Sequence, residues 1–194
     1  MLPSARRAPA ADVVFIGDSL TEDWRSIGAE VWEARYARRG AVDFGVGGDR
    51  TDDVLWRIER GQLDGIAPRL VVLLVGTNDL GNGVSPAQTF EGIAACVRAI
   101  RARLPDARLL LLGLLPRGTG GPQTGMRRAV AAVNAALARL DDGRHLHFLD
   151  IGHAFLEADG TVRAELFELD KLHVTAAGYR AWADAMAATF DTLV

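Results

Sequence analysis

The sequence has 194 residues, of which 49% are hydrophobic and 24% are charged, and its net charge at pH 7 is −3. This composition is typical of a globular chain with its own hydrophobic core, and we expect a single domain over residues 1–194. It excludes disordered and collagen-like chains, and the small negative charge gives no reason to expect nucleic acid as a partner. The lone cysteine, Cys96, excludes an intramolecular disulfide and a cysteine-based metal cluster.

The N-terminus gives no clear targeting signal. Arg6 and Arg7 are not followed by an apolar run of signal-peptide length. No stretch approaches the roughly 18 apolar residues of a membrane-spanning helix. We therefore expect a cytoplasmic protein without a membrane span, although a leader that had been removed would leave the same sequence.

Five short apolar runs alternate with amphipathic stretches along the chain. The runs are typical of buried parallel strands, because they are short and most end at Gly or Asp. They are residues 13–16, 41–44, 70–75, 109–112 and 146–149. Helical spacing of apolar residues predicts helices between and after them, at about 54–58, 90–104, 130–140 and 175–186. This alternation predicts a three-layer α/β fold with a mostly parallel sheet.

Polar segments follow the predicted strands. They are Gly-Asp-Ser-Leu at 17–20, Gly-Val-Gly-Gly-Asp at 45–49, Gly-Thr-Asn-Asp at 76–79 and, about 20 residues after the fifth strand, Asp-Lys-Leu-His at 170–173. Ligands of open parallel sheets bind beyond the carboxyl ends of the strands. We therefore expect these four segments to meet at one edge of the sheet.

The four segments supply complementary chemistry. Ser19 offers a hydroxyl nucleophile, His173 can accept its proton, and Asp170 can hold the imidazole tautomer. The backbone N–H groups of Ser19 and Gly48 and the side-chain amide of Asn78 give three donors for a developing oxyanion. These groups predict hydrolysis of an ester or thioester. No metal or organic cofactor is expected.

The same segments resemble the hallmark blocks of the GDSL or SGNH hydrolase family, and the resemblance covers nearly the whole chain. It implies a triad of Ser19, Asp170 and His173 and an oxyanion hole at Ser19, Gly48 and Asn78. Residues 44–51, 54–57 and 112–118 also look like the catalytic subunits of the intracellular platelet-activating-factor acetylhydrolases.

That closer resemblance implies a flavodoxin-like parallel sheet of five strands in the order 2-1-3-4-5. It also implies a small acyl pocket narrowed by Leu20, Thr77 and Leu172, hence a preference for acetyl or other short acyl groups, and a homodimer. A preference for a phospholipid headgroup does not carry over, because the surrounding loops need not match.

Structural roles remain open for the same residues. Ser19 could be a helix N-cap, Gly48 a turn glycine with positive φ, and Asn78 an Asx turn. Asp170 and His173 could cap the last helix, although Thr175 is the better cap candidate.

Other polar and aromatic residues have simpler expected roles. We expect Asp18 and Asp49 to fix loop geometry, and Cys96 to be a partly buried, inert thiol. His145, His147 and His153 have no spacing that indicates a metal site. Thr51 or Asp52 could cap the helix at 54–58.

Two expectations concern the surroundings of the site. The tryptophans should be packing residues, although Trp24, near Ser19, could line the pocket; the set is Trp24, Trp32, Trp56 and Trp182. The glycine-rich loop at 116–125, with Arg117, is expected to shape the alcohol side of the pocket.

Three other functions have some support in the sequence. Residues 45–48 begin like a dinucleotide-binding fingerprint, but Arg50 stands at the third glycine position and the segment follows the second strand. The second alternative is an inactive hydrolase fold that serves only as a binding module, and the complete set of triad residues argues against it. Carbohydrate O-deacetylation, lysophospholipid hydrolysis and thioester hydrolysis would all use the same groups, although a small pocket disfavours long acyl chains.

Overall fold

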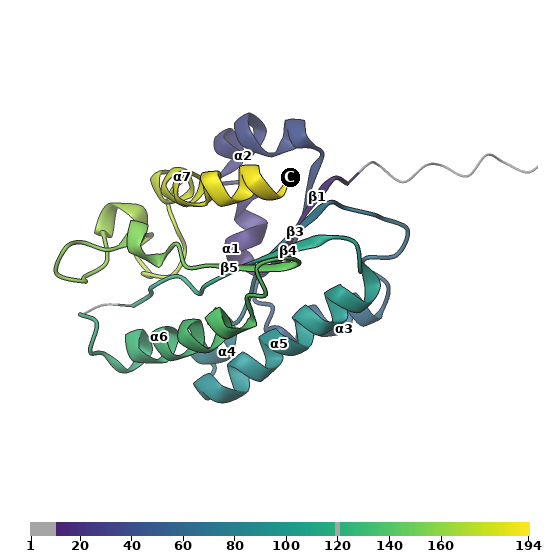
Figure 1. The fold of residues 1–194 in the computed structure, drawn as a ribbon. Coiled ribbons are helices and arrows are strands. Elements are labelled where there is room, and N and C mark those ends of the chain that lie inside the picture. The colour runs from purple at the N-terminus through teal and green to yellow at the C-terminus, as the bar shows by residue number, and fades with distance from the viewer. Residues whose placement is uncertain (1–10, 119–120) are drawn as a thin grey trace, which may run out of the picture.

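The structure is a computed structural model that describes residues 11–118 and 121–194 (Figure 1). The Arg6–Arg7 pair and part of the loop at 116–125 therefore lie outside the described residues. The strands form one parallel sheet in the order β2-β1-β3-β4-β5. Their bounds are β1 Val13–Gly17, β2 Ala41–Gly45, β3 Leu70–Leu74, β4 Arg108–Leu112 and β5 Leu146–Leu149. The predicted sheet and strand order are confirmed.

Helices cover both faces of the sheet, which confirms the predicted three layers. The α-helices are α1 Ser19–Glu22, α2 Ala29–Arg35, α3 Thr51–Glu59, α4 Thr77–Gly81, α5 Pro86–Arg103, α6 Gly125–Leu137 and α7 Ala176–Leu193. Figure 1 shows α1, α2 and α7 on one face and α3 to α6 on the other. Successive strands are added to one side of β1 and then, from β3 onward, to the other side, and a crevice for ligands forms at such a switch point between β1 and β3.

An aromatic cluster fills the layer between the sheet and α2 and α7. Phe15 of β1 lies at its base, and the Trp24 and Tyr179 ring centroids are 4.4 Å apart. The cluster comprises Phe15, Trp24, Trp32, Tyr36, Tyr179, Trp182 and Phe190. Trp24 is fully buried within it, so the suggestion that it lines a pocket is wrong. The packing role expected for Trp56 is also wrong, because 58% of that residue is exposed.

The helix caps agree only partly with expectation. Thr175 caps α7, since its side chain accepts a hydrogen bond from the backbone N–H of Gly178, as predicted. The N-cap of α3 is Arg50, so the prediction of Thr51 or Asp52 is wrong. The Thr51 hydroxyl instead donates to Asp79 of α4 over 2.6 Å, which joins the starts of two helices.

Cys96 is completely buried on α5, more deeply than predicted, and its thiol donates to the backbone carbonyl of Thr51 over 3.2 Å. Burial raises the pKa of this thiol to about 12, which fits the inert role expected of it. Across the described ranges, no helix is both long enough and apolar enough to cross a bilayer.

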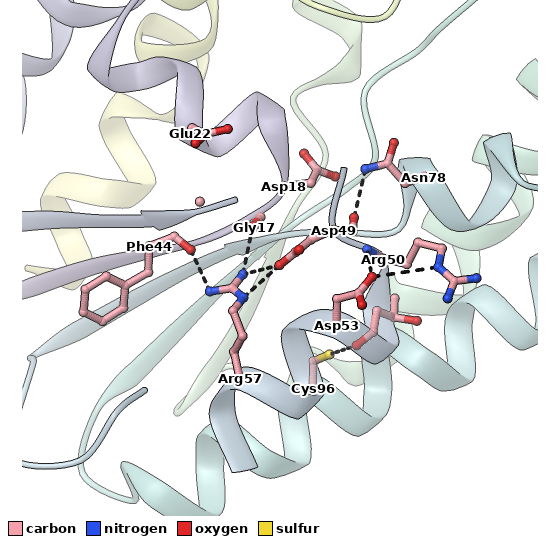
Figure 2. A network of polar contacts seen from close by, with 12 residues as sticks. Gly17, Asp18, Glu22, Phe44, Asp49, Arg50, Asp53, Arg57, Asn78 and Cys96 are labelled. Carbon is pink, nitrogen blue, oxygen red and sulfur yellow. Dashed lines mark hydrogen bonds and ion pairs between the residues drawn. The ribbon is translucent and has the colours of Figure 1, made fainter. Parts of the chain in front are cut away.

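Arg57 of α3 joins the ends of two strands to the loop that follows β2 (Figure 2). Its Nη1 donates to the carbonyl oxygen of Phe44 over 3.0 Å, and its Nη2 donates to that of Gly17 over 3.3 Å. The Asp49 carboxylate accepts from Nε over 2.8 Å and lies 2.6 Å from Nη2. Both side chains of this ion pair are largely buried, with 14% and 12% of their surface exposed. Gly17 begins the polar segment at 17–20, and Asp49 ends the polar segment at 45–49. The guanidinium therefore fixes the positions of these two segments relative to each other.

Replacing Arg57 by Gln should lower the free energy of unfolding by about 3 kcal/mol, because a largely buried carboxylate loses its partner. Urea unfolding monitored by tryptophan fluorescence measures this loss. Arg60→Gln, at an exposed arginine at the end of the same helix, is the control and should stay within about 0.5 kcal/mol of the wild type. Equal losses in the two variants would contradict the role given to Arg57.

Candidate functional site

Ser19 is the first residue of α1, directly after β1 and its tight turn. Gly17 ends the strand, and a Cβ there would overlap the Thr21 hydroxyl and the backbone carbonyl of Leu74, so only glycine fits. The N-cap of α1 is Asp18, whose Oδ1 accepts the backbone N–H of Leu20 over 3.0 Å. The interpretation of Ser19 as a helix cap is therefore wrong, and its hydroxyl is left for another partner.

That partner is His173. Ser19 Oγ lies 2.9 Å from His173 Nε2, although the two residues are 154 positions apart in the sequence. His173 Nδ1 lies 2.6 Å from Asp170 Oδ2, and Asp170 Oδ1 accepts the backbone N–H groups of Leu172 and His173. A carboxylate at Nδ1 holds the proton on that nitrogen, which leaves Nε2 to accept the serine proton. This is the geometry that makes a serine hydroxyl nucleophilic.

The Asp170 carboxyl is kept ionised by its hydrogen bonds. Partial burial raises its pKa, but the bonds from the His173 ring and from the backbone of Leu172 and His173 outweigh burial and hold the pKa below its usual value. The short loop needs an unusual backbone, because Lys171 adopts φ +56° between the two side chains. Its carbonyl oxygen accepts the backbone N–H of Gly118 over 2.9 Å, which ties this loop to the segment after β4.

The loop after β2 reaches Ser19 from the other side. A Cβ built on Gly47 would lie 4.0 Å from Ser19 Cβ, so the turn at 47–48 lies beside the serine. Gly48 has φ +82°, which confirms the turn glycine and is a conformation that other residues rarely adopt. In the described part of the chain, the backbone N–H groups of Ser19 and Gly48 donate to no protein acceptor.

Asn78 of α4 is fixed by the same loop. Its Nδ2 donates to the backbone carbonyl of Asp49 over 2.8 Å, as Figure 2 shows. An amide nitrogen carries two protons, so one N–H remains for a ligand. The Asx-turn interpretation is not supported, because the side chain bonds a residue 29 positions away. Two neighbouring carboxylates support this arrangement: Asp49 pairs with Arg57, and Asp79 accepts the backbone N–H of Thr51.

The three residues expected to narrow an acyl pocket differ in environment. Leu20 is buried in the core with 1% of its surface exposed, and its carbonyl accepts the Tyr179 hydroxyl over 2.8 Å. Thr77 is buried and accepts Arg117 Nη1 at both its carbonyl and its hydroxyl oxygen. Leu172 is partly exposed. Arg117 is thus anchored at the edge of the sheet, where a ligand would approach.

The remaining histidines are not near one another in any cluster of metal-ligating side chains within the described residues. His153 is exposed, and His145 and His147 are partly exposed near the last strand. Sequence reasoning did not single out Arg57 or Asp79 as supports of the site. The partners of Arg57 are two backbone carbonyls and the Asp49 carboxylate, and the partner of Asp79 is Thr51, and no local spacing reveals these contacts.

Asp18 is the buried carboxyl next to the serine. It is completely buried, and its Oδ2 has no hydrogen-bond partner among the described residues. Burial raises its pKa to about 7, against the opposing effects of the Leu20 N–H and of His173. Because the folded pKa exceeds the ordinary carboxyl value, the folded protein holds this proton more tightly than the unfolded chain does. The stability that comes from protonation is therefore lost as the pH rises to about 7.

The Asp18→Asn variant keeps a good helix cap and cannot ionise. The difference in unfolding free energy between this variant and the wild type should grow in favour of the variant by about 2 to 3 kcal/mol from pH 5 to pH 8. Urea unfolding at the two pH values measures it. Asp12→Asn, at an exposed position, should retain the wild-type pH dependence. A pH-independent difference for Asp18→Asn would show that Asp18 does not hold its proton in the folded protein.

Comparison with known proteins identifies the family. The GDSL-like lipase/acylhydrolase family matches residues 15–181. Platelet-activating factor acetylhydrolase IB subunit alpha1 from Bos taurus is 40% identical over 171 residues, which cover 87% of this chain and 70% of that protein. A GDSL-like lipase from Bacteroides thetaiotaomicron has a similar structure, with TM-score 0.78, 19% identity and coverage of 94% and 88%. An acetylxylan esterase from Geobacillus stearothermophilus has TM-score 0.74, 18% identity and coverage of 94% and 95%. The chain belongs to the GDSL-like lipase/acylhydrolase family and is a carboxylic ester hydrolase.

Proposed function

We propose that this esterase removes short acyl groups, acetyl above all, from an alcohol through a triad of Ser19, His173 and Asp170. The observation that carries the proposal is the unbroken chain of short contacts from Asp170 Oδ2 to His173 Nδ1 and from His173 Nε2 to Ser19 Oγ. The names of the relatives, a platelet-activating-factor acetylhydrolase subunit and an acetylxylan esterase, support acetyl as the acyl group.

In the first half-reaction, His173 Nε2 takes the proton of Ser19 Oγ while that oxygen attacks the ester carbonyl. The oxyanion of the tetrahedral intermediate accepts hydrogen bonds from the N–H groups of Ser19 and Gly48 and from the free amide N–H of Asn78. His173 then gives its proton to the leaving alcohol oxygen, and the acyl group stays on Ser19. In the second half, His173 activates a water that releases the carboxylic acid and restores the serine.

The acyl side of the site is proposed to be narrow. Both Leu20 and Thr77 are buried. The Tyr179 hydroxyl fixes the backbone of Leu20, and the Arg117 guanidinium fixes both the backbone and the hydroxyl of Thr77, so a long chain could displace neither residue easily. Leu172 follows from the resemblance alone as the third side of the pocket. Because a methyl group needs little room, acetate and butyrate esters should fit and octanoate esters should not.

A chain-length series of p-nitrophenyl esters tests both claims. We expect kcat/KM to be highest for acetate or butyrate, and Ser19→Ala to lose about 10⁴-fold or more with all of them. Ser26→Ala, at an exposed serine that bonds Asp23, is the matched control and should stay within about twofold. A maximum at octanoate would overturn the small pocket, and an active Ser19→Ala variant would overturn the triad.

Asn78→Ala tests the oxyanion donors separately from the triad. A missing donor to the oxyanion should lower kcat on p-nitrophenyl acetate about 10²- to 10³-fold, with a small change in KM, because the bond strengthens only in the transition state. Steady-state kinetics measure the split between the two constants. The control is Glu91→Ala, at an exposed position of α5, and should leave both constants within about twofold of the wild type. If Asn78→Ala raised KM alone, its amide would serve substrate binding instead.

A further inference from the structure

A cavity lies between α6 and the segments that follow β4 and β5. Its volume is about 250 Å³, and its walls are mostly apolar, with Leu114, Val130 and Leu156 among them. It contains none of the three residues of the proposed triad. Arg127 of α6 supplies a positive charge to the cavity wall.

One nitrogen of the Arg127 guanidinium is buried and unpaired. Only 8% of the residue is exposed, and within the described chain its Nη1 has no hydrogen-bond partner. Desolvation by burial lowers the pKa of Arg127. Arg57 shows the contrast, because all three of its side-chain nitrogens are paired. A buried N–H donor without an acceptor is costly, so an occupant that supplied an acceptor to Nη1 would be stabilised.

Asp150 and Asn134, two further polar residues of the cavity wall, already have partners. Asp150 Oδ2 accepts Asn134 Nδ2 over 2.9 Å, and Asp150 Oδ1 accepts the backbone N–H of Gly152 over 2.8 Å. The Asn134 amide also exchanges hydrogen bonds with the backbone of Leu114. Two polar residues of the cavity wall then remain for a ligand, Arg127 and His153, whose Nδ1 lies 3.3 Å from the carbonyl oxygen of Asp150. Of these two, Arg127 is the buried one and His153 is exposed.

We propose that this cavity binds a small carboxylate with an apolar chain, its carboxyl group on Arg127 and its chain against Leu114, Val130 and Leu156. The planar guanidinium matches a carboxylate, with which it forms charge-assisted hydrogen bonds. A volume of about 250 Å³ holds roughly eight heavy atoms at the 30 Å³ that a water molecule takes up in the liquid. Hexanoate, with a carboxyl group and five further carbons, has that size.

The cavity and the proposed active site share one segment of chain. Pro116 lines the cavity, while the next residue, Arg117, bonds Thr77 and Gly118 bonds Lys171. The carboxylate therefore binds beside the esterase machinery and uses none of its groups. Because of this, binding at Arg127 can be measured whether or not the proposed triad is correct.

Isothermal titration of the full-length protein with hexanoate tests the proposal, with hexan-1-ol and hexylamine as probes of equal length. We expect hexanoate to bind at millimolar or lower concentration and both other probes to bind at least about tenfold more weakly, because each lacks the carboxylate. Arg127→Met should weaken hexanoate binding about tenfold or more. Arg128→Met, at the exposed neighbour on the same helix, should change it less than twofold.

Two further variants complete the titration experiment. If Arg127→Met does not fold, Ala131→Phe, which fills the cavity wall, should abolish hexanoate binding in its place. Hexanoate should also bind Ser19→Ala as well as it binds the wild type. The proposal is overturned if hexanoate does not bind the wild type at millimolar concentration, or if Arg127→Met binds it normally. Tighter binding of hexylamine, or loss of hexanoate binding in Ser19→Ala, would overturn it as well.

Discussion

The site depends on one guanidinium at the carboxyl edge of the sheet. Arg57 binds the last carbonyl of β1, the carbonyl of Phe44 on β2 and the Asp49 carboxylate, so three separate chain segments are held by one rigid, planar group. The turn that presents Ser19 and the loop that presents Gly48 begin at these anchor points. An oxyanion hole requires donors that are already in place before reaction, since reorganisation would cost the energy that they supply. Arg57 provides that rigidity through contacts with Gly17, Phe44 and Asp49, which flank the proposed nucleophile and oxyanion donors.

The two faces of the sheet contribute differently to the site. On one face, the aromatic cluster fixes α1, because the Tyr179 hydroxyl donates to the Leu20 carbonyl and Trp24 packs against the Tyr179 ring. The other face is tied by polar contacts, since Asp79 joins α4 to the start of α3. The proposed nucleophile is therefore positioned mainly by apolar packing, while the proposed oxyanion donors are positioned mainly by hydrogen bonds. Asp18, buried between them, is a carboxyl that this packing keeps protonated up to about pH 7.

Much of this architecture is predictable from the sequence. The five strands follow from short apolar runs, and their observed ends differ from the predicted ones by at most one residue. The approach of Ser19 to His173 follows from the rule that strand ends share an edge. The supports are not predictable in the same way, because Arg57 bonds main-chain carbonyls of other elements. The burial of Trp24, the exposure of Trp56 and the unpaired Nη1 of Arg127 likewise depend on how whole helices pack.

The most direct test of the central claim is covalent labelling of the proposed nucleophile. A small fluorophosphonate reacts with a serine only where a neighbouring base activates the hydroxyl. Intact-mass and peptide mass spectrometry should find one adduct per chain, located on Ser19, and labelling should be slowed strongly in His173→Ala. Ser26, an exposed serine outside the site, should remain unlabelled. An adduct at another residue, or equal labelling of Ser19→Ala, would contradict the account.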